Sequence, residues 1–107
     1  MILDNCKRIG SIAFRRDNLE SLIPNKPGIY IFWSGRYCVY VGQAKDLRSR
    51  LLTHWRKSHN DGVNIWIRAR GADLCVSHEI VKGNLSDMEQ SYISRYRPHL
   101  NKINARI

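Results

Sequence analysis

Two neighbouring segments of the chain are dense in apolar and aromatic residues. Residues 28–33 and 37–41 are rich in Ile, Val, Tyr, Phe and Trp, and Ser34-Gly35-Arg36 between them has the composition of a turn. This pattern predicts a β-hairpin. A three-residue loop would set Tyr30 directly opposite Tyr40 on one face of the sheet, whereas a two-residue turn would move Tyr40 to the other face.

Helical periodicity begins after the hairpin. Within residues 44–58 the apolar side chains recur at three- to four-residue spacing, at Ala44, Leu47, Leu51 and Trp55. The spacing predicts a helix with that stripe packed inward. The basic side chains on its other faces are expected to point mostly to water: Arg48, Arg56 and Lys57.

A second helix is predicted from about Ser86 to Arg97, where Pro98 ends it. Its apolar stripe consists of Leu85, Met88, Tyr92 and Tyr96. Ser86 and Glu89 have the spacing of a capping box, so one interpretation of Glu89 is a helix cap alone. Glu89 also lies at the edge of the stripe, where a half-buried carboxylate needs a partner such as a divalent cation. Both interpretations stay open.

Shorter runs complete the predicted elements. Strands are expected at residues 64–68 and 74–81, and a short helix at 17–22. The set predicts an α/β fold of the α+β type, in which helices flank a small, mainly antiparallel sheet of three or four strands. A chain of 107 residues has room for one domain. We expect its core at residues 24–101, after a basic N-terminal extension at 1–23.

The chain is strongly basic, because eighteen Lys and Arg against nine Asp and Glu give a net charge of +9. Such a charge favours polyanionic partners, although a merely basic soluble protein has the same balance. No stretch has the length of a membrane span, and the chain does not start with a leader pattern. We therefore expect a cytoplasmic protein without a membrane partner.

Cysteine usage predicts little chemistry. Cys6, Cys38 and Cys75 are odd in number, lie far apart and form no C-x-x-C pair. Neither a disulfide framework nor a zinc site is expected from them. Cys38 and Cys75 fall in apolar strand patterns and are expected to be small core residues.

Two short motifs and three later residues form an ordered series along the chain. The series reads Gly28-Ile29-Tyr30, Tyr40-Val41-Gly42, Arg50, Glu89 and Asn101. The arginine follows the second tyrosine by ten residues, and the asparagine follows the glutamate by twelve. On these residues, positions 24–101 resemble the GIY-YIG nuclease family. The similarity is greatest to the nuclease domains of nucleotide excision repair incision subunits and to small single-domain members.

The resemblance implies a compact α/β nuclease that cuts nucleic acid with one Mg²⁺ or Mn²⁺. By position it implies that Glu89 is the metal ligand and that Tyr30 positions or deprotonates the attacking water. Tyr40 would be its neighbour around the scissile phosphate. Arg50 would stabilise the phosphate as negative charge builds, and Asn101 would order the cleft. The residue types suit this chemistry, because a single carboxylate leaves most positions of Mg²⁺ to water and phosphate, and a guanidinium matches phosphate oxygens.

A tyrosine is a poor general base near neutral pH by itself, because the ordinary pKa of tyrosine is about 10. Neighbouring cations must favour the phenolate, or a relay must share the proton. His54 lies one helical turn after Arg50, and some restriction enzymes of the family use a histidine so placed, so His54 is a candidate relay. The alternative is a surface histidine on a basic helix. The resemblance also implies that Gly28 and Gly42 serve close packing and backbone shape.

Gln43 departs from the family pattern, since many relatives carry lysine directly after the second motif. A glutamine can hydrogen-bond to substrate but supplies no electric field for the tyrosine, which predicts weak activity unless Lys45 or His54 compensates. Gln43, Lys45 and Arg48 are the expected substrate-binding residues of this segment.

The sequence says less about the substrate. Basic residues outside the motifs could hold phosphates without reading bases: Lys7, Arg8, Arg15, Arg16, Arg68, Arg70, Arg95 and Arg97. We expect DNA cleavage with weak sequence specificity, or with specificity supplied by a partner protein. A non-cleaving nucleic-acid-binding module of the same fold and a nuclease acting on RNA stay open. Trp33, Trp55 and Trp66 are expected in the core rather than stacked on bases.

Overall fold

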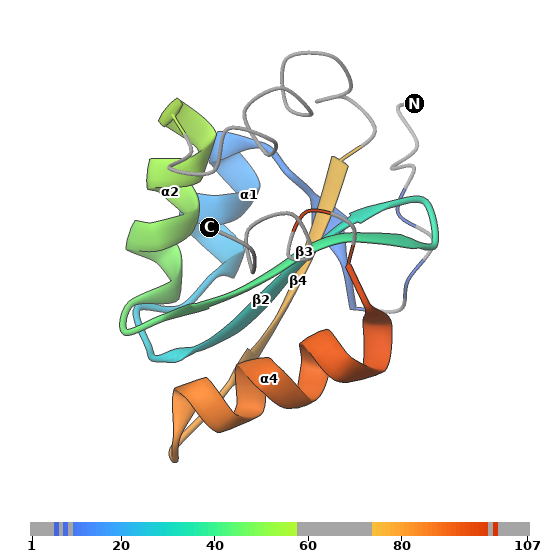
Figure 1. Cartoon of the computed structure of the whole chain (residues 1–107). Helices are drawn as coiled ribbons and strands as arrows, with labels where there is room; N and C mark the ends of the chain where they lie inside the picture. The colour runs from blue at the N-terminus through green and yellow to red at the C-terminus, as the bar shows by residue number, and fades with distance from the viewer. Residues whose placement is uncertain (1–5, 7, 9, 58–73, 99, 101–107) are drawn as a thin grey trace.

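The computed structural model of the chain describes residues 6, 8, 10–57, 74–98 and 100 (Figure 1). Its strands form one sheet in the spatial order β1-β4-β2-β3, and all neighbouring strands are antiparallel. The strands are β1 (Ile12–Ala13), β2 (Gly28–Ser34), β3 (Tyr37–Ala44) and β4 (Leu74–Ile80). The predicted antiparallel sheet is confirmed, whereas the strand expected at residues 64–68 lies outside the described residues.

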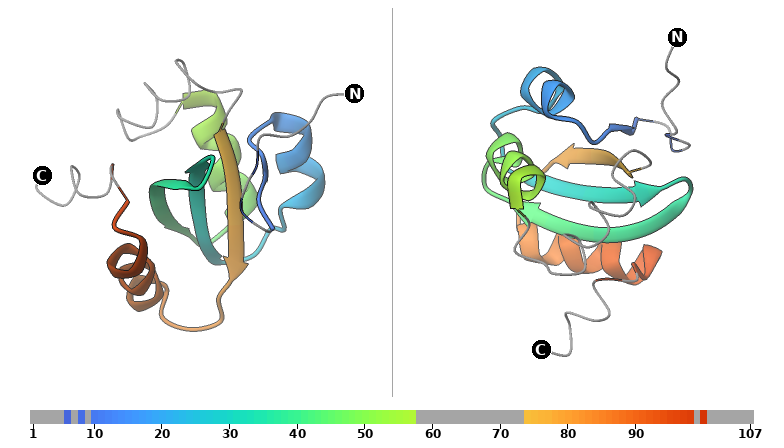
Figure 2. Two further views of the ribbon diagram at one scale, coloured as in Figure 1. Left: turned by 90° about the vertical axis from the view of Figure 1, so that its right-hand side faces the viewer. Right: turned by 90° about the horizontal axis from the view of Figure 1, so that it is seen from above.

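In the described part of the chain, three helices flank this sheet, as the sequence predicted. They are α1 (Arg16–Leu22), α2 (Leu47–Lys57) and α4 (Leu85–Tyr96). Helices α1 and α2 lie on one side of the sheet, and α4 lies across the other (Figure 2). Each layer has its own apolar cluster, one containing Phe32 and Leu51 and the other containing Trp33 and Val41. None of the described helices is long and apolar enough to cross a membrane.

The hairpin between β2 and β3 closes on a shorter turn than expected. Ser34 pairs with Tyr37, so the loop contains two residues instead of three. Gly35 supplies the positive φ of 62° that such a turn favours. A two-residue turn alone would place Tyr40 on the face opposite to Tyr30.

A β-bulge cancels this change of face. The pairing shifts by one residue along the hairpin, and Val39 is the extra residue on β3. The predicted pairing of Tyr30 with Tyr40 is therefore wrong, because Tyr30 lies opposite Gly42. Both tyrosines nevertheless pack into the cluster under α1 and α2, with ring centroids 6.2 Å apart.

Helix α2 keeps part of its predicted stripe. Leu47 and Leu51 are fully buried, but Trp55 at the far end is 40% exposed, so its assignment to the core is wrong. Trp33 is buried as expected. Arg48 does not point freely to water, because its Nε donates a hydrogen bond to the Ile23 carbonyl oxygen at 2.7 Å.

Helix α4 begins earlier than its sequence suggested. Asn84 is the N-cap, and its side chain accepts a hydrogen bond from the Asp87 amide at 3.0 Å. Ser86 therefore lies inside the first turn, and the capping box expected between Ser86 and Glu89 does not form. The predicted apolar stripe of α4 does pack against the sheet.

A disulfide joins Cys6 to Cys75 across 69 positions of the sequence, with the Cα atoms 5.6 Å apart. The expectation of no disulfide is therefore wrong. Short strand β1 pairs with Val76 and Cys75 in β4, which brings the preceding segment over that strand. Cys38 is buried as a free thiol, and burial raises its pKa to about 12, so it stays protonated at neutral pH.

Candidate active site

Residues from both strands of the hairpin and from two helices meet where β3 runs into α2. Tyr30 comes from β2 and Tyr40 from β3. His54 belongs to α2, and Glu89 belongs to the second turn of α4. The sheet lies between these two helices, so the site forms at the edge of the sheet where both layers are accessible.

Tyr30 and His54 form a buried pair. Tyr30 is 2% exposed and His54 is 3% exposed. The Tyr30 hydroxyl lies 2.7 Å from His54 Nε2, and the two rings meet edge to face. The alternative of a surface histidine is therefore wrong. Position 54 turns inward because it shares a helix face with Leu47 and Leu51, which are fully buried.

The electrostatic surroundings of Tyr30 oppose its ionisation. Burial raises the pKa of Tyr30 well above its ordinary value, and Tyr40 adds to the increase. The positive charge of Arg50 lowers this pKa, whereas the negative charge of Glu89 raises it again. Tyr30 is therefore a neutral phenol near pH 7 in the absence of metal.

Tyr40 occupies a more open position beside this pair. Its ring centroid lies 6.1 Å from that of His54. Burial raises the pKa of Tyr40, Glu89 raises it further, and Arg50 lowers it. The pKa values of both tyrosines thus depend on the positive charge of Arg50 from α2 and on the negative charge of Glu89 from α4. The four side chains therefore share one electrostatic environment.

Glu89 is half-buried, and its neighbour is a neutral amide. Gln43 Nε2 lies 3.3 Å from Glu89 Oε1. Burial raises the pKa of Glu89, and this hydrogen bond lowers it. In the part of the chain that the structure describes, no ion pair with Glu89 is found.

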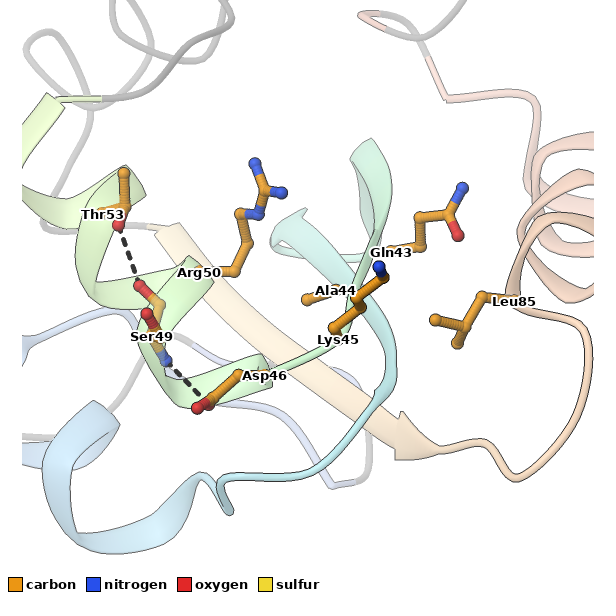
Figure 3. A pocket seen from close by; sticks show the side chains of 8 residues that line it. All are labelled: Gln43, Ala44, Lys45, Asp46, Ser49, Arg50, Thr53 and Leu85. Atoms are coloured by element: carbon orange, nitrogen blue, oxygen red, sulfur yellow. Dashed lines mark hydrogen bonds between the residues drawn. The ribbon is translucent and has the colours of Figure 1, made fainter.

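An open pocket of about 720 Å³ lies beside these residues (Figure 3). The side chains of Arg50 from α2 and of Gln43 from β3 stand on its two sides, with Lys45 between them (Figure 3). The complete lining is Gln43, Ala44, Lys45, Asp46, Ser49, Arg50, Thr53 and Leu85. The size and basic lining suit a phosphate group with its sugar and solvent.

Glu89 fits a divalent cation. It does not line the pocket itself, but Gln43 of the lining contacts its carboxylate, and no described cation neutralises its charge. Among the described residues, no group of three or more His, Cys, Asp or Glu side chains surrounds a point where a metal could sit. A cation here would therefore take one carboxylate oxygen from the protein and the rest of its ligands from water and phosphate, as Mg²⁺ commonly does.

The two motif glycines make room for neighbouring groups. A Cβ atom on Gly42 would overlap the Tyr30 ring, which lies against the Gly42 backbone. A Cβ atom on Gly28 would overlap the Glu79 carbonyl and approach Leu47 Cδ1 to 2.8 Å. Glycine at both positions is thus needed for packing, and Gly42 in particular lets Tyr30 reach His54.

Of the predicted site residues, Gln43, Lys45 and Arg50 line the pocket, and the others that the structure describes do not. Arg48 contacts the loop after α1 and does not line the pocket. Asn101 lies outside the described residues. Ser49 and Thr53 were not among the predicted site residues, yet they line the pocket on the same side of α2 as Arg50. Their spacing around Arg50 on a helix was the available signal.

Asp46 was also missed, and it fixes the start of α2. Its Oδ1 accepts hydrogen bonds from the Ser49 amide at 3.1 Å and from Asn25 Nδ2 at 3.0 Å. A carboxylate that caps the first turn of a helix is stabilised by the free amides there. This cap sets the rotation of α2 and hence the directions of Arg50 and His54.

Comparison with known proteins gives a consistent match to this fold and motif set. A family model described as UvrC-like GIY-YIG domain matches residues 26–102. The chain is 37% identical over 82 residues to UvrABC system protein C of Fervidobacterium nodosum, and 34% identical over 88 residues to that of Aquifex aeolicus. These matches cover 74% and 79% of this chain but only 14% and 15% of those relatives.

Solved structures agree with the sequence matches. The GIY-YIG N-terminal endonuclease domain of UvrC from Thermotoga maritima, bound to magnesium as its catalytic divalent cation, superposes with a TM-score of 0.63 at 28% identity. The superposition covers 79% of this chain and 92% of that domain. The matched residues include both motifs and Glu89 within the family span. The chain therefore belongs to the UvrC-like GIY-YIG domain family.

Proposed function

We propose that this chain is a divalent-metal-dependent endonuclease that hydrolyses phosphodiester bonds in DNA with low intrinsic sequence specificity. The observation that supports this most strongly is the buried Tyr30–His54 pair, which lies under the opposing charges of Arg50 and Glu89. Arg50 lines the pocket, and the phenol, imidazole and carboxylate of Tyr30, His54 and Glu89 lie beside it. Together these are the kinds of group that attack on a phosphodiester requires.

Glu89 is the proposed ligand of the cation. When bound, Mg²⁺ or Mn²⁺ would lower the pKa of a coordinated water and neutralise charge on the phosphate. Glu89 suits the role because burial disfavours its bare charge and no described cation compensates it.

Tyr30 and His54 are the proposed route for the proton. As the attacking water gives its proton to the Tyr30 oxygen, the Tyr30 hydroxyl gives its own proton to His54 Nε2, 2.7 Å away. This relay avoids a free phenolate, which matters because burial holds the pKa of Tyr30 well above its ordinary value. Tyr40 lies beside the pair and is the proposed group that orients the water or the phosphate.

Arg50 is the proposed stabiliser of the phosphate. Its exposed guanidinium stands in the pocket on the opposite side from Gln43 (Figure 3). A planar, forked donor can bind two phosphate oxygens and gains strength as charge develops on them. Lys45 lines the same pocket and adds positive charge there. Asn101 is proposed to order the cleft, as the family pattern implies.

The substrate and setting are proposed from the relatives and from charge. The relatives are UvrABC system proteins, so DNA in a repair complex, with partner proteins that choose the target, is the proposed context. The net charge of +9 favours binding to phosphates without base reading. The cytoplasmic location stays a prediction, and the Cys6–Cys75 disulfide would be unusual there.

The proposal is tested with supercoiled plasmid in the presence of Mg²⁺, Mn²⁺ or chelator. We expect the wild-type protein to nick DNA only with metal, and Glu89→Gln, Arg50→Ala and Tyr30→Phe to lose at least about a hundredfold in rate. Arg36→Ala is the matched control, because Arg36 is an exposed arginine of the hairpin turn outside the pocket. It should cleave like the wild type.

Four results would contradict the proposal or redirect it. Metal-independent nicking, or full activity of folded Glu89→Gln, would remove the metal role. Binding without cleavage under all conditions would favour a non-cleaving module of the same fold. Cleavage of RNA and not of DNA in a parallel assay would replace DNA with RNA as the substrate.

A further inference from the structure

Gln43 links the sheet to the helix that carries Glu89. Its Nε2 lies 3.3 Å from Glu89 Oε1 and 3.4 Å from Ser86 Oγ. Ser86 and Glu89 are three positions apart on α4 and so lie on one face of that helix. One amide group of β3 is therefore directed at two neighbouring side chains of α4.

The backbone of Gln43 is well fixed. Gln43 pairs with Ile29 in the β2–β3 ladder, and the next residue, Ala44, is buried. Alternation along β3 sends the Gln43 side chain toward α4, away from the Tyr30 face. A side chain anchored in this way restrains the carboxylate that it contacts.

The chemistry of this contact is specific to an amide. A glutamine amide donates a hydrogen bond to Glu89 without cancelling its negative charge. A lysine at the same position, which many relatives carry, would place an ammonium group beside the carboxylate, and a cation would then bind Glu89 less tightly than it does beside a neutral amide. The neutral donor thus orients Glu89 and leaves its charge available.

We propose that Gln43 is a positioning residue that holds Glu89 for a divalent cation and thereby sets the metal affinity of the site. This role differs from the substrate contact expected from the sequence, because Gln43 acts through Glu89. It rests on the proposed function, in which Glu89 is the metal ligand. Its consequence is that the charge at position 43 controls the metal concentration at which the site is occupied.

The test measures Mn²⁺ binding to the full chain by isothermal titration calorimetry, without nucleic acid. Gln43→Lys should weaken Mn²⁺ binding by about tenfold or more, the effect that a neighbouring charge commonly has on a carboxylate. Gln43→Ala should weaken it by about threefold, because the restraint is lost but no charge is added. Thermal melting of each variant shows whether the change is confined to the site.

Gln90→Lys is the matched control, because Gln90 is exposed on α4 next to Glu89 and the substitution adds the same charge. It should keep Mn²⁺ affinity within about twofold if only the contact with Glu89 matters, since exposed charges interact weakly. An equal loss in Gln43→Lys and Gln90→Lys would overturn the proposal in favour of a general charge effect. Unchanged affinity in folded Gln43→Lys and Gln43→Ala would overturn it as well.

Glu89→Gln separates this proposal from the one on which it rests. If Glu89→Gln abolishes Mn²⁺ binding while the Gln43 variants bind normally, Glu89 is the ligand and Gln43 has no part in positioning it. If Glu89→Gln binds Mn²⁺ as tightly as the wild type, the metal role of Glu89 itself fails. Weaker binding in both sets, with normal binding by Gln90→Lys, is the result that we expect.

Discussion

At the scale of single residues, the proposed site depends most on the Tyr30 hydroxyl. It is buried, it contacts His54 Nε2, and its pKa is held high by burial against the opposing charge of Arg50. A tyrosine in this state is a poor base by itself. Tyr30 can take a proton from water when a second group accepts the Tyr30 proton in the same step. That is the role proposed for His54.

The raised tyrosine pKa values predict how stability depends on pH. Burial raises the pKa of Tyr30 and Tyr40, and the hydrogen bond to Glu79 raises that of Tyr92 to about 12. Because these folded-state values exceed the unfolded value of about 10, the stabilisation is complete below about pH 10 and declines as the pH rises toward 12. Urea unfolding at several pH values, with tyrosinate absorbance recorded in parallel, measures this decline.

Tyr92→Phe is the control for that experiment. It removes the group whose folded-state pKa is about 12 and leaves Tyr30 and Tyr40, the other tyrosines with a raised pKa among the described residues, in place. The variant should lose less stability than the wild type between pH 10 and about pH 12. Tyrosinate absorbance that is complete near pH 10 in the folded protein would contradict the prediction.

The hairpin is the element that organises the site. Its two-residue turn and the bulge at Val39 each change the face on which later residues of β3 point, and together they leave Tyr40 on the same face as Tyr30. The bulge also sets Gly42 opposite Tyr30, where the absence of a side chain makes room for the tyrosine ring. The second motif of the sequence is therefore a packing partner of the first.

Gly42→Ala tests this arrangement. The new methyl group would overlap the Tyr30 ring, so we expect a loss of about 1–3 kcal/mol in the free energy of unfolding and a loss of cleavage, as Tyr30 moves away from His54. Gly83→Ala is the matched control, because a Cβ there meets no atom within 4 Å. It should change stability by less than about 0.5 kcal/mol. Equal urea midpoints for the two variants would show that Tyr30 does not need the space.

At the scale of the whole molecule, the N-terminal segment connects the sheet to α4. The Cys6–Cys75 disulfide attaches the segment to β4. The Arg8 guanidinium lies 4.4 Å from the centroid of the Trp33 ring and 5.5 Å from that of the Tyr96 ring. These contacts connect β2, β4 and the end of α4 on the side of the sheet away from Tyr30.

Reduction of the disulfide is expected to lower stability without removing the site. A link across 69 positions restricts the unfolded chain strongly, so a reductant should lower the free energy of unfolding by about 2–4 kcal/mol. Urea unfolding with and without the reductant measures the difference. Cys6→Ser should show the same loss and no further response to reductant. A wild-type protein that is indifferent to reductant, or that contains three free thiols by titration, would contradict the link.

Much of the fold and part of the site could be predicted from the sequence. The hairpin and the last helix followed from periodicity, and the motif pattern identified Tyr30, Arg50 and Glu89 together. The capping-box pattern at Ser86 predicted the wrong start for α4, because the N-cap is Asn84, two residues earlier. The disulfide was missed for a different reason: two cysteines far apart in sequence carry no local signal of their approach.

The sequence by itself determined which elements form and which residue types are available for phosphodiester chemistry, because periodicity and turn composition act over a few neighbouring residues. Only the tertiary structure decided which elements and which side chains come into contact. The bulge at Val39 set the faces of the hairpin, the packing of α2 buried His54 against Tyr30, and the approach of α4 brought Glu89 to Gln43. Such contacts depend on strand register and helix placement, which are fixed by the packing of the whole core.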